Sequence, residues 1–160
     1  MVYFFPLGPR LRALLRLPSY RALLGYEFFR ARNIRFMTDV MDSPAWQELM
    51  GPPSRECKRI GLQFCSDGFQ AYTNKNCPKS LKPWCMMVLS LPPALRTRSE
   101  FMLLSMLMPA NVKNYGQKKY FDFVSEFELQ QLWHVGVSGV KVKVFASSMD
   151  TPGRADLLGT

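Results

Sequence analysis

The sequence predicts a mixed α/β domain in which strand, strand, strand, helix and strand follow one another after a few short helices. Residues 60–65 and residues 140–144 alternate apolar and polar side chains, which is the spacing of half-buried strands. Two apolar runs between them, at residues 84–91 and 101–108, are closed by prolines, which favours buried strands over helices. Residues 121–133 have apolar side chains at helical intervals and no helix breaker.

The first 31 residues predict two short helices, over about 9–17 and 19–31, that pack on a core through leucine and aromatic side chains. Prolines at positions 6, 9 and 18 divide this segment, because a proline inside a helix costs about 3 kcal/mol. A basic start without acidic residues is also typical of a mitochondrial targeting sequence, and this is the alternative interpretation.

Residues 37–56 predict a loop that contains one helical turn. Asp42 or Ser43 is suited to cap this turn and Pro44 to begin it, whereas Gly51, followed by two prolines, ends it. Further along, glycines at positions 136 and 139 mark the end of the long helix before the last strand.

The composition excludes several classes of protein. The chain has 160 residues, of which 48% are hydrophobic and 21% charged, so it can bury a core and is not a disordered tail. Its longest uncharged apolar stretches have about ten residues, whereas a membrane-spanning helix needs about 20. We therefore expect no integral membrane segment. No glycine-rich phosphate loop of a nucleotide-binding enzyme is present.

The four cysteines, at positions 57, 65, 77 and 85, are too few for a disulfide-built miniprotein and lack the close pairs of a zinc site. The single histidine, His134, supports neither a zinc site nor a thiol nucleophile and is expected at the surface or at a helix end. We therefore expect reduced, partly buried thiols in an intracellular protein.

The net charge of +9 is unevenly distributed. Residues 1–36 contribute +6 and residues 58–119 contribute +8, whereas residues 37–57 and 120–135 are acidic. A basic excess of this size favours a polyanionic partner, most simply nucleic acid, because neutralised phosphates release their counterions. An anionic lipid surface would also fit, and so would a basic surface without a partner.

An acidic residue follows the first and the last strand of the predicted sheet, namely Asp67 and Asp150. If these two strands lie parallel, their carboxyl ends share one edge of the sheet and the two carboxylates approach each other. Two carboxylates suit a Mg²⁺ or Mn²⁺ ion, which can activate water and stabilise the oxygens of a reacting phosphodiester. The pair Asp67-Gly68 is also a common turn sequence, so spacing alone leaves the metal site open.

Four blocks of sequence follow one another along the chain. Residues 60–72 are IGLQFCSDGFQAY, and residues 82–93 hold Lys-Pro-Trp and a later Leu-Pro-Pro. Residues 98–103 are RSEFML, and residues 121–133 begin with Phe-Asp and end with ELQQLW. These blocks resemble, in the same order, the segments GLxLxxDGFxxF, WP…NLPP, KxEFMxL and D…ELxxLW of CACTA-type (En/Spm-like) DNA transposases. Stretches upstream of the first block also resemble that family, so the resemblance covers nearly the whole chain.

The resemblance implies an RNase H-like fold with an acidic DDE/D triad that performs metal-dependent DNA cleavage and strand transfer. By position, Asp67 matches the first acid of the triad. Asp150 matches the second, in a segment similar to NDxPAxxxLxG, although Arg154 and Asp156 depart from the family's pattern there. Both aspartates would be catalytic residues and ligands of a Mg²⁺ or Mn²⁺ ion.

The third acid of the family would come after Thr160. We therefore expect a helical and loop segment over residues 1–58 and an incomplete RNase H-like core over residues 59–160, truncated before its last strand. Such a fragment would be catalytically inactive, would bind the metal weakly or not at all, and would be nuclear or otherwise intracellular. Its open sheet edge would favour oligomerisation and poor solubility.

Basic residues near Asp67 and after the proline pair are candidates for contacts with a DNA backbone. A solvated basic loop is the alternative interpretation for them. These candidates are Lys75, Lys79, Lys82, Arg96 and Arg98.

Two functions of different classes remain. The first is a transposase-derived catalytic domain that binds DNA. The second is a basic protein without catalysis that binds nucleic acid or an anionic membrane surface through its leucine- and arginine-rich N-terminus.

Overall fold

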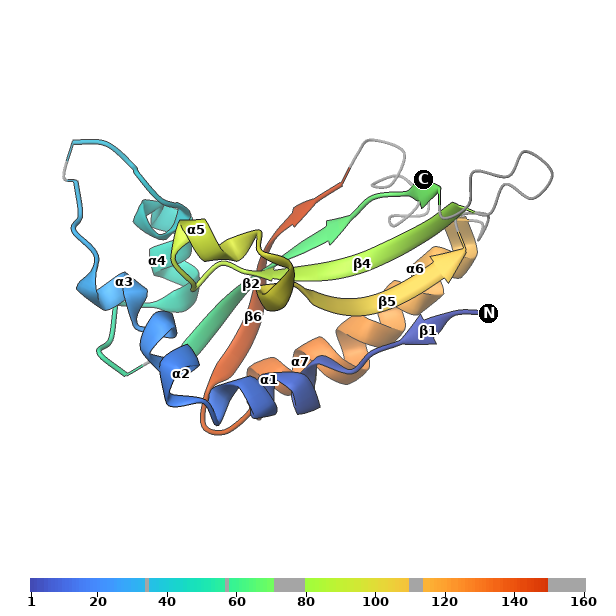
Figure 1. Cartoon of the computed structure of the whole chain (residues 1–160), viewed down its shortest axis with the longest axis horizontal. Helices are drawn as coiled ribbons and strands as arrows, with labels where there is room; N and C mark the ends of the chain where they lie inside the picture. Colours follow the sequence, from blue (N-terminus) through green and yellow to red (C-terminus); the bar gives the residue numbers. More distant parts are fainter. Residues whose placement is uncertain (34, 57, 71–79, 110–113, 150–160) are drawn as a thin grey trace.

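The computed structural model describes residues 1–33, 35–56, 58–70, 80–109 and 114–149. The described strands form one mixed sheet in the order β1-β5-β4-β2-β6, with the short β3 paired to β4. They are β1 (Tyr3–Phe4), β2 (Arg59–Ser66), β3 (Phe69–Gln70), β4 (Ser80–Val88), β5 (Leu103–Pro109) and β6 (Lys141–Ser148). Figure 1 shows α1, α6 and α7 along one side of this sheet, whereas α3, α4 and α5 gather at one end of the molecule.

Short helical elements connect the strands. Before β2 lie α1 (Leu7–Leu15), α2 (Pro18–Leu24), α3 (Tyr26–Phe29), the 3₁₀ turn η1 (Val40–Asp42) and α4 (Pro44–Met50). Between β4 and β5 lie α5 (Pro93–Arg96) and the 3₁₀ turn η2 (Ser99–Phe101). Between β5 and β6 lie α6 (Asn114–Phe123), the π-helical η3 (Val124–Leu129) and α7 (Gln130–His134). In the described part of the chain, no helix combines the length and the apolar character that crossing a membrane requires.

The pairing of the strands confirms the predicted α/β order. β2 is antiparallel to β4, β4 to β5, and β5 to β1. The long helical segment then returns the chain so that β6 lies parallel to β2, with Ile60 opposite Val142. The first and last predicted strands are therefore parallel neighbours, and their carboxyl ends do share one edge of the sheet.

The N-terminal helices bury their leucines in the same core as the sheet. Leu7, Leu11 and Leu15 are spaced four apart and thus face one way on α1, where at most 2% of each side chain is exposed. Pro9 is tolerated because it lies in the first turn, where the backbone N–H has no partner within the helix. The predicted second helix is shorter than expected, because the chain breaks at Gly25 into α2 and α3.

The predicted helical turn is α4, and Ser43 is its cap. The Ser43 hydroxyl accepts a hydrogen bond from the backbone N–H of Trp46 at 3.2 Å, Pro44 is the first helical residue, and Gly51 ends the helix with a φ of +73°. Trp46 is fully buried in a second, smaller core on the side of the sheet opposite the leucines, beside Phe145. This small core covers only the end of that face at which β2 begins.

Some elements differ from their predicted bounds. The predicted helix over 121–133 is the later part of a longer one, in which Phe123 of α6 and Phe127 of the π-helical turn are 42% and 68% exposed. The strand expected at 84–91 begins four residues earlier and ends at Val88, and β5 begins two residues later than expected, after η2. The strand β1 was not predicted, because two residues are too few to show an alternation.

Candidate functional site

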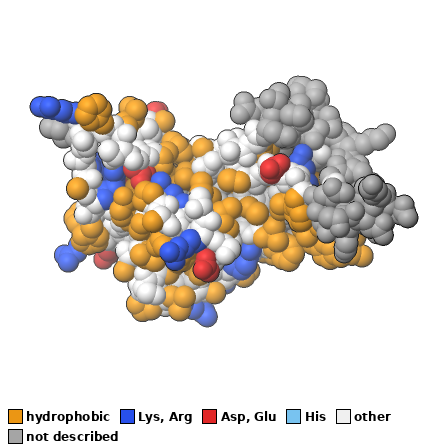
Figure 2. All heavy atoms as spheres, turned by 45° about the horizontal axis from the view of Figure 1, so that its top comes forward, with side chains coloured by type: hydrophobic (Ala, Val, Ile, Leu, Met, Phe, Trp, Pro, Cys, Tyr) orange, Lys and Arg blue, Asp and Glu red, His pale blue; other side chains and the backbone are white. Residues whose placement is uncertain are grey.

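Asp67 lies where the central strand β2 ends. It is exposed, and with Cys65 and Ser66 it lines an open pocket of about 370 Å³. The other lining residues come from β4, from the segment before β5 and from the end of β6, and they are Pro83, Cys85, Met102, Ser148 and Met149. The covering helices leave this part of the sheet open, and Figure 2 shows many hydrophobic side chains on that side of the molecule, next to the residues drawn in grey.

The end of β6 lies beside the end of β2. Cys65 is the register partner of Ser148, and Met149, the last described residue, lines the same pocket as Asp67. Asp150 itself lies outside the described residues. The last described residue before Asp150 therefore lies at the same edge of the sheet as Asp67.

The described residues alone do not form a site for Mg²⁺ or Mn²⁺. Within the ranges given above, no group of three or more His, Cys, Asp or Glu side chains is arranged to hold an ion. Asp67 supplies one hard oxygen ligand to the pocket, whereas Cys65 and Cys85 supply sulfur, which suits softer metals. A magnesium site at this edge would need oxygen ligands besides Asp67.

Cys65 and Cys85 face each other across β2 and β4 as register partners. Both are free, half-buried thiols, which confirms the expectation for these two cysteines; Cys57 and Cys77 lie outside the described residues. Burial raises the pKa of both thiols, so each stays protonated, and therefore weakly nucleophilic, at neutral pH. His134 is exposed at the end of α7, as expected.

Of the five candidate DNA-binding residues, Lys75 and Lys79 lie outside the described residues. Lys82 is in β4 rather than in a loop, and its ammonium group donates to Gln117 Oε1 at 3.1 Å. Arg96 is paired with Asp39 at 2.8 Å and also donates to the carbonyl of Leu91.

Arg98 lies two residues after Arg96, and its side chain is exposed. Of the described candidates, Lys82 and Arg96 have partners inside the protein, whereas Arg98 faces solvent.

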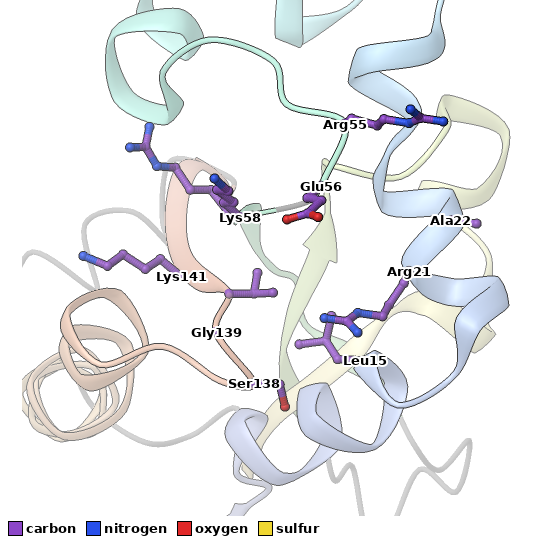
Figure 3. A pocket seen from close by; sticks show the side chains of 11 residues that line it. Leu15, Arg21, Ala22, Arg55, Glu56, Lys58, Ser138, Gly139 and Lys141 are labelled. Atoms are coloured by element: carbon purple, nitrogen blue, oxygen red, sulfur yellow. The ribbon is translucent and has the colours of Figure 1, made fainter.

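A second pocket, of about 800 Å³, lies at the opposite end of the parallel strands, where β2 and β6 begin. Five basic side chains and one acidic side chain line it: Arg21, Arg55, Lys58, Arg59, Lys141 and Glu56. They come from α2, from the loop before β2, from the first residue of β2 and from the start of β6 (Figure 3). This site was not predicted from the sequence, because its charged residues come from three separate segments. The basic excess of the whole chain was the only sign of a basic site.

Comparison with known proteins identifies no relative: no family model, no curated protein and no solved structure matches this chain.

Proposed function

We propose that this chain is a transposase-derived domain with an RNase H-like core, ancestrally a metal-dependent DNA cleavage and strand-transfer enzyme, and that it binds DNA. One observation carries the proposal: β2 is flanked by antiparallel β4 and parallel β6, with Asp67 at the edge where β2 and β6 end. This is the arrangement implied by the resemblance of residues 60–72 and the blocks that follow them. The activity proposed for this chain is DNA binding.

The alternative, a basic protein that binds a polyanion without any metal, has its own support in the basic pocket where β2 and β6 begin. Binding to an anionic membrane surface, the other form of this alternative, is disfavoured by the packing of α1. The leucines Leu7, Leu11 and Leu15, which would have to enter a bilayer, are instead buried in the core. Deletion of residues 1–36 would remove them from the core, so the N-terminal contribution has to be tested with the exposed Arg12 and Arg16.

The experiment measures two affinities of the whole chain: for Mn²⁺, by the paramagnetic resonance signal of the free ion, and for a fluorescent 20-bp DNA duplex, by anisotropy. We expect DNA binding that weakens steeply with salt, because phosphate contacts release counterions. Asp67→Asn and Asp150→Asn should each abolish any Mn²⁺ binding that the wild-type chain has, and should leave the DNA affinity equal or higher, since a negative charge near the phosphates is lost. Glu48→Gln, at an exposed site on α4, removes the same charge elsewhere and serves as the control.

The results separate the two functions. If the aspartate variants change neither affinity and Arg12→Gln with Arg16→Gln removes binding, the basic-protein alternative is correct. If the DNA affinity of the wild-type chain does not change with salt, contact with phosphates is excluded. DNA binding then fails both for the transposase-derived domain and for the basic protein without catalysis.

A further inference from the structure

The pocket where β2 and β6 begin is strongly basic. Its lining carries five positive charges and one negative charge, and both Lys58 and Lys141 are exposed. In Figure 3, Arg21 points from α2 toward the middle of the pocket, and Glu56 enters it from the loop above. Arg55 and Lys141 line the pocket with their stems and carry their charges outward at its rim.

Backbone pairing places three of these basic residues side by side where the parallel strands begin. Arg59 and Lys141 are register partners at the first position of the parallel pair, and the backbone N–H of Lys141 donates to the carbonyl of Lys58 at 3.0 Å. The tight turn before β6 is closed by hydrogen bonds in both directions between Val137 and Val140. One side of the pocket is thus formed by hydrogen-bonded backbone, which lowers the entropy cost of ordering its side chains around a ligand.

Like charges in and around one pocket repel one another, and an anion relieves this repulsion. The basic surface also continues beyond the pocket along β6. Lys143 lies two residues after Lys141, about 7 Å further along the strand, and its ammonium group is 4.5 Å from the centre of the Trp133 ring. A row of positive charge beside an aromatic ring suits a chain of phosphates better than a single small anion.

We propose that this pocket binds phosphate groups of a nucleic acid backbone, as a second contact surface at the opposite end of β2 and β6 from Asp67. This inference rests on the DNA binding proposed above, and it adds the position of the DNA on the protein. β2 has eight residues, so the two ends of the strand are roughly 25 Å apart. A duplex that contacts both ends must therefore extend over about eight base pairs.

The test compares how the DNA affinity of the whole chain depends on salt in two triple variants with the same charge. Arg21→Gln, Lys58→Gln and Lys141→Gln remove three charges from the pocket. Arg32→Gln, Arg35→Gln and Lys118→Gln remove three charges from exposed sites outside it. Arg59 is left intact, because its guanidinium donates to the carbonyl of Met50 and holds α4 to β2.

We expect the slope of log affinity against log salt for a 16-bp DNA hairpin to fall by about 3 in the pocket variant and by less than 1 in the control. A 6-bp hairpin is too short to reach both ends of β2. In the wild-type chain its slope should be smaller than that of the 16-bp hairpin, and this difference should disappear in the pocket variant. The charge-preserving variant with Arg21→Lys, Lys58→Arg and Lys141→Arg should keep the wild-type slopes.

Each other result overturns the inference. If the pocket and control variants lower the slope equally, DNA binds elsewhere and the proposed function survives without this site. If the wild-type chain binds no DNA, the proposed function fails as well. If it binds inorganic pyrophosphate or vesicles with 30% phosphatidylserine, but not DNA, the pocket takes a free phosphate or a membrane instead. Should the triple variant not fold, Lys58→Gln alone must lower the slope by about 1.

Discussion

Arg96 and Asp39 form a buried ion pair that ties the connection between β4 and β5 to the segment before α4. The guanidinium is 2.8 Å from the carboxylate, and only 11% and 2% of the two side chains are exposed. The same guanidinium donates to the carbonyl of Leu91 at 2.8 Å. Arg96 therefore holds two distant segments together. Its positive charge is already paired with Asp39, so it attracts a ligand only weakly.

Arg96→Gln should lower the free energy of unfolding by about 3 kcal/mol, because it leaves the Asp39 carboxylate buried without its partner. Arg98→Gln, two residues further on at an exposed position, should change it by less than about 0.5 kcal/mol. Urea unfolding of the two variants measures the difference. Equal and small effects would show that Asp39 is hydrated, and would return Arg96 to the candidates for DNA contact.

Gly61→Ala should also destabilise the protein, by about 2 kcal/mol. A Cβ atom at position 61 would overlap the ring of Trp46, which is fully buried and cannot move aside. Gly68→Ala is the matched control, since no contact within 4 Å is found among the described residues for the Cβ that it would add. Thermal unfolding should give a clearly lower midpoint for the first variant only; similar midpoints would mean that the small core around Trp46 is loosely packed.

The open edge of the sheet gives a prediction about self-association. Among the described strands, β6 has a neighbour on one side only, and its second half, Phe145–Ser148, has no charged residue. An unprotected edge of this kind pairs with a second chain, and a lysine there opposes such pairing. In sedimentation velocity, Ser147→Lys should therefore reduce the associated fraction, whereas Ala94→Lys on α5 should not. A wild-type chain that is monomeric at all concentrations would contradict this.

The sequence predicted best what depends on local pattern. Alternation marked β2 and β6 as strands, and the capping chemistry of Ser43, Pro44 and Gly51 marked α4. Contacts between distant segments were not predictable, because they depend on how the chain folds back on itself. Gly61 looks like an ordinary strand position until Trp46 is placed against it.

The candidate site divides in the same way. The position of Asp67 was predictable because the residue directly follows a strand. The edge of the sheet that it shares with the end of β6 is confirmed. The pairing of Arg96 with Asp39 was not predictable, because the two residues are 57 positions apart in the chain. The basic pocket combines Arg21, Lys58 and Lys141, which no single stretch of sequence brings together.

The buried carboxylate of Glu128 gives a prediction about pH. Its Oε1 accepts hydrogen bonds from the backbone N–H groups of Leu7 and Gly8, at the start of α1, whereas its buried Oε2 has no partner among the described residues. Burial raises the pKa of this carboxyl group, although the two N–H groups and Arg10 oppose the shift. Between the ordinary pKa of glutamate and this raised pKa, the folded state therefore holds a proton that the unfolded state has released.

This difference in bound protons makes the wild-type protein lose stability as pH rises from the ordinary pKa of glutamate, about 4.3, through the raised pKa of Glu128. In Glu128→Gln the amide stays neutral and can still accept from the start of α1, so this loss is absent. We therefore expect urea unfolding between pH 4 and 7.5 to show the variant gaining stability relative to wild type as pH rises. Glu126→Gln, at an exposed position in the same π-helical turn, should follow the wild-type curve. If Glu128→Gln instead loses stability relative to wild type as pH rises, the N–H groups of α1 hold the carboxylate in its charged form, and the attraction of the helix end outweighs burial.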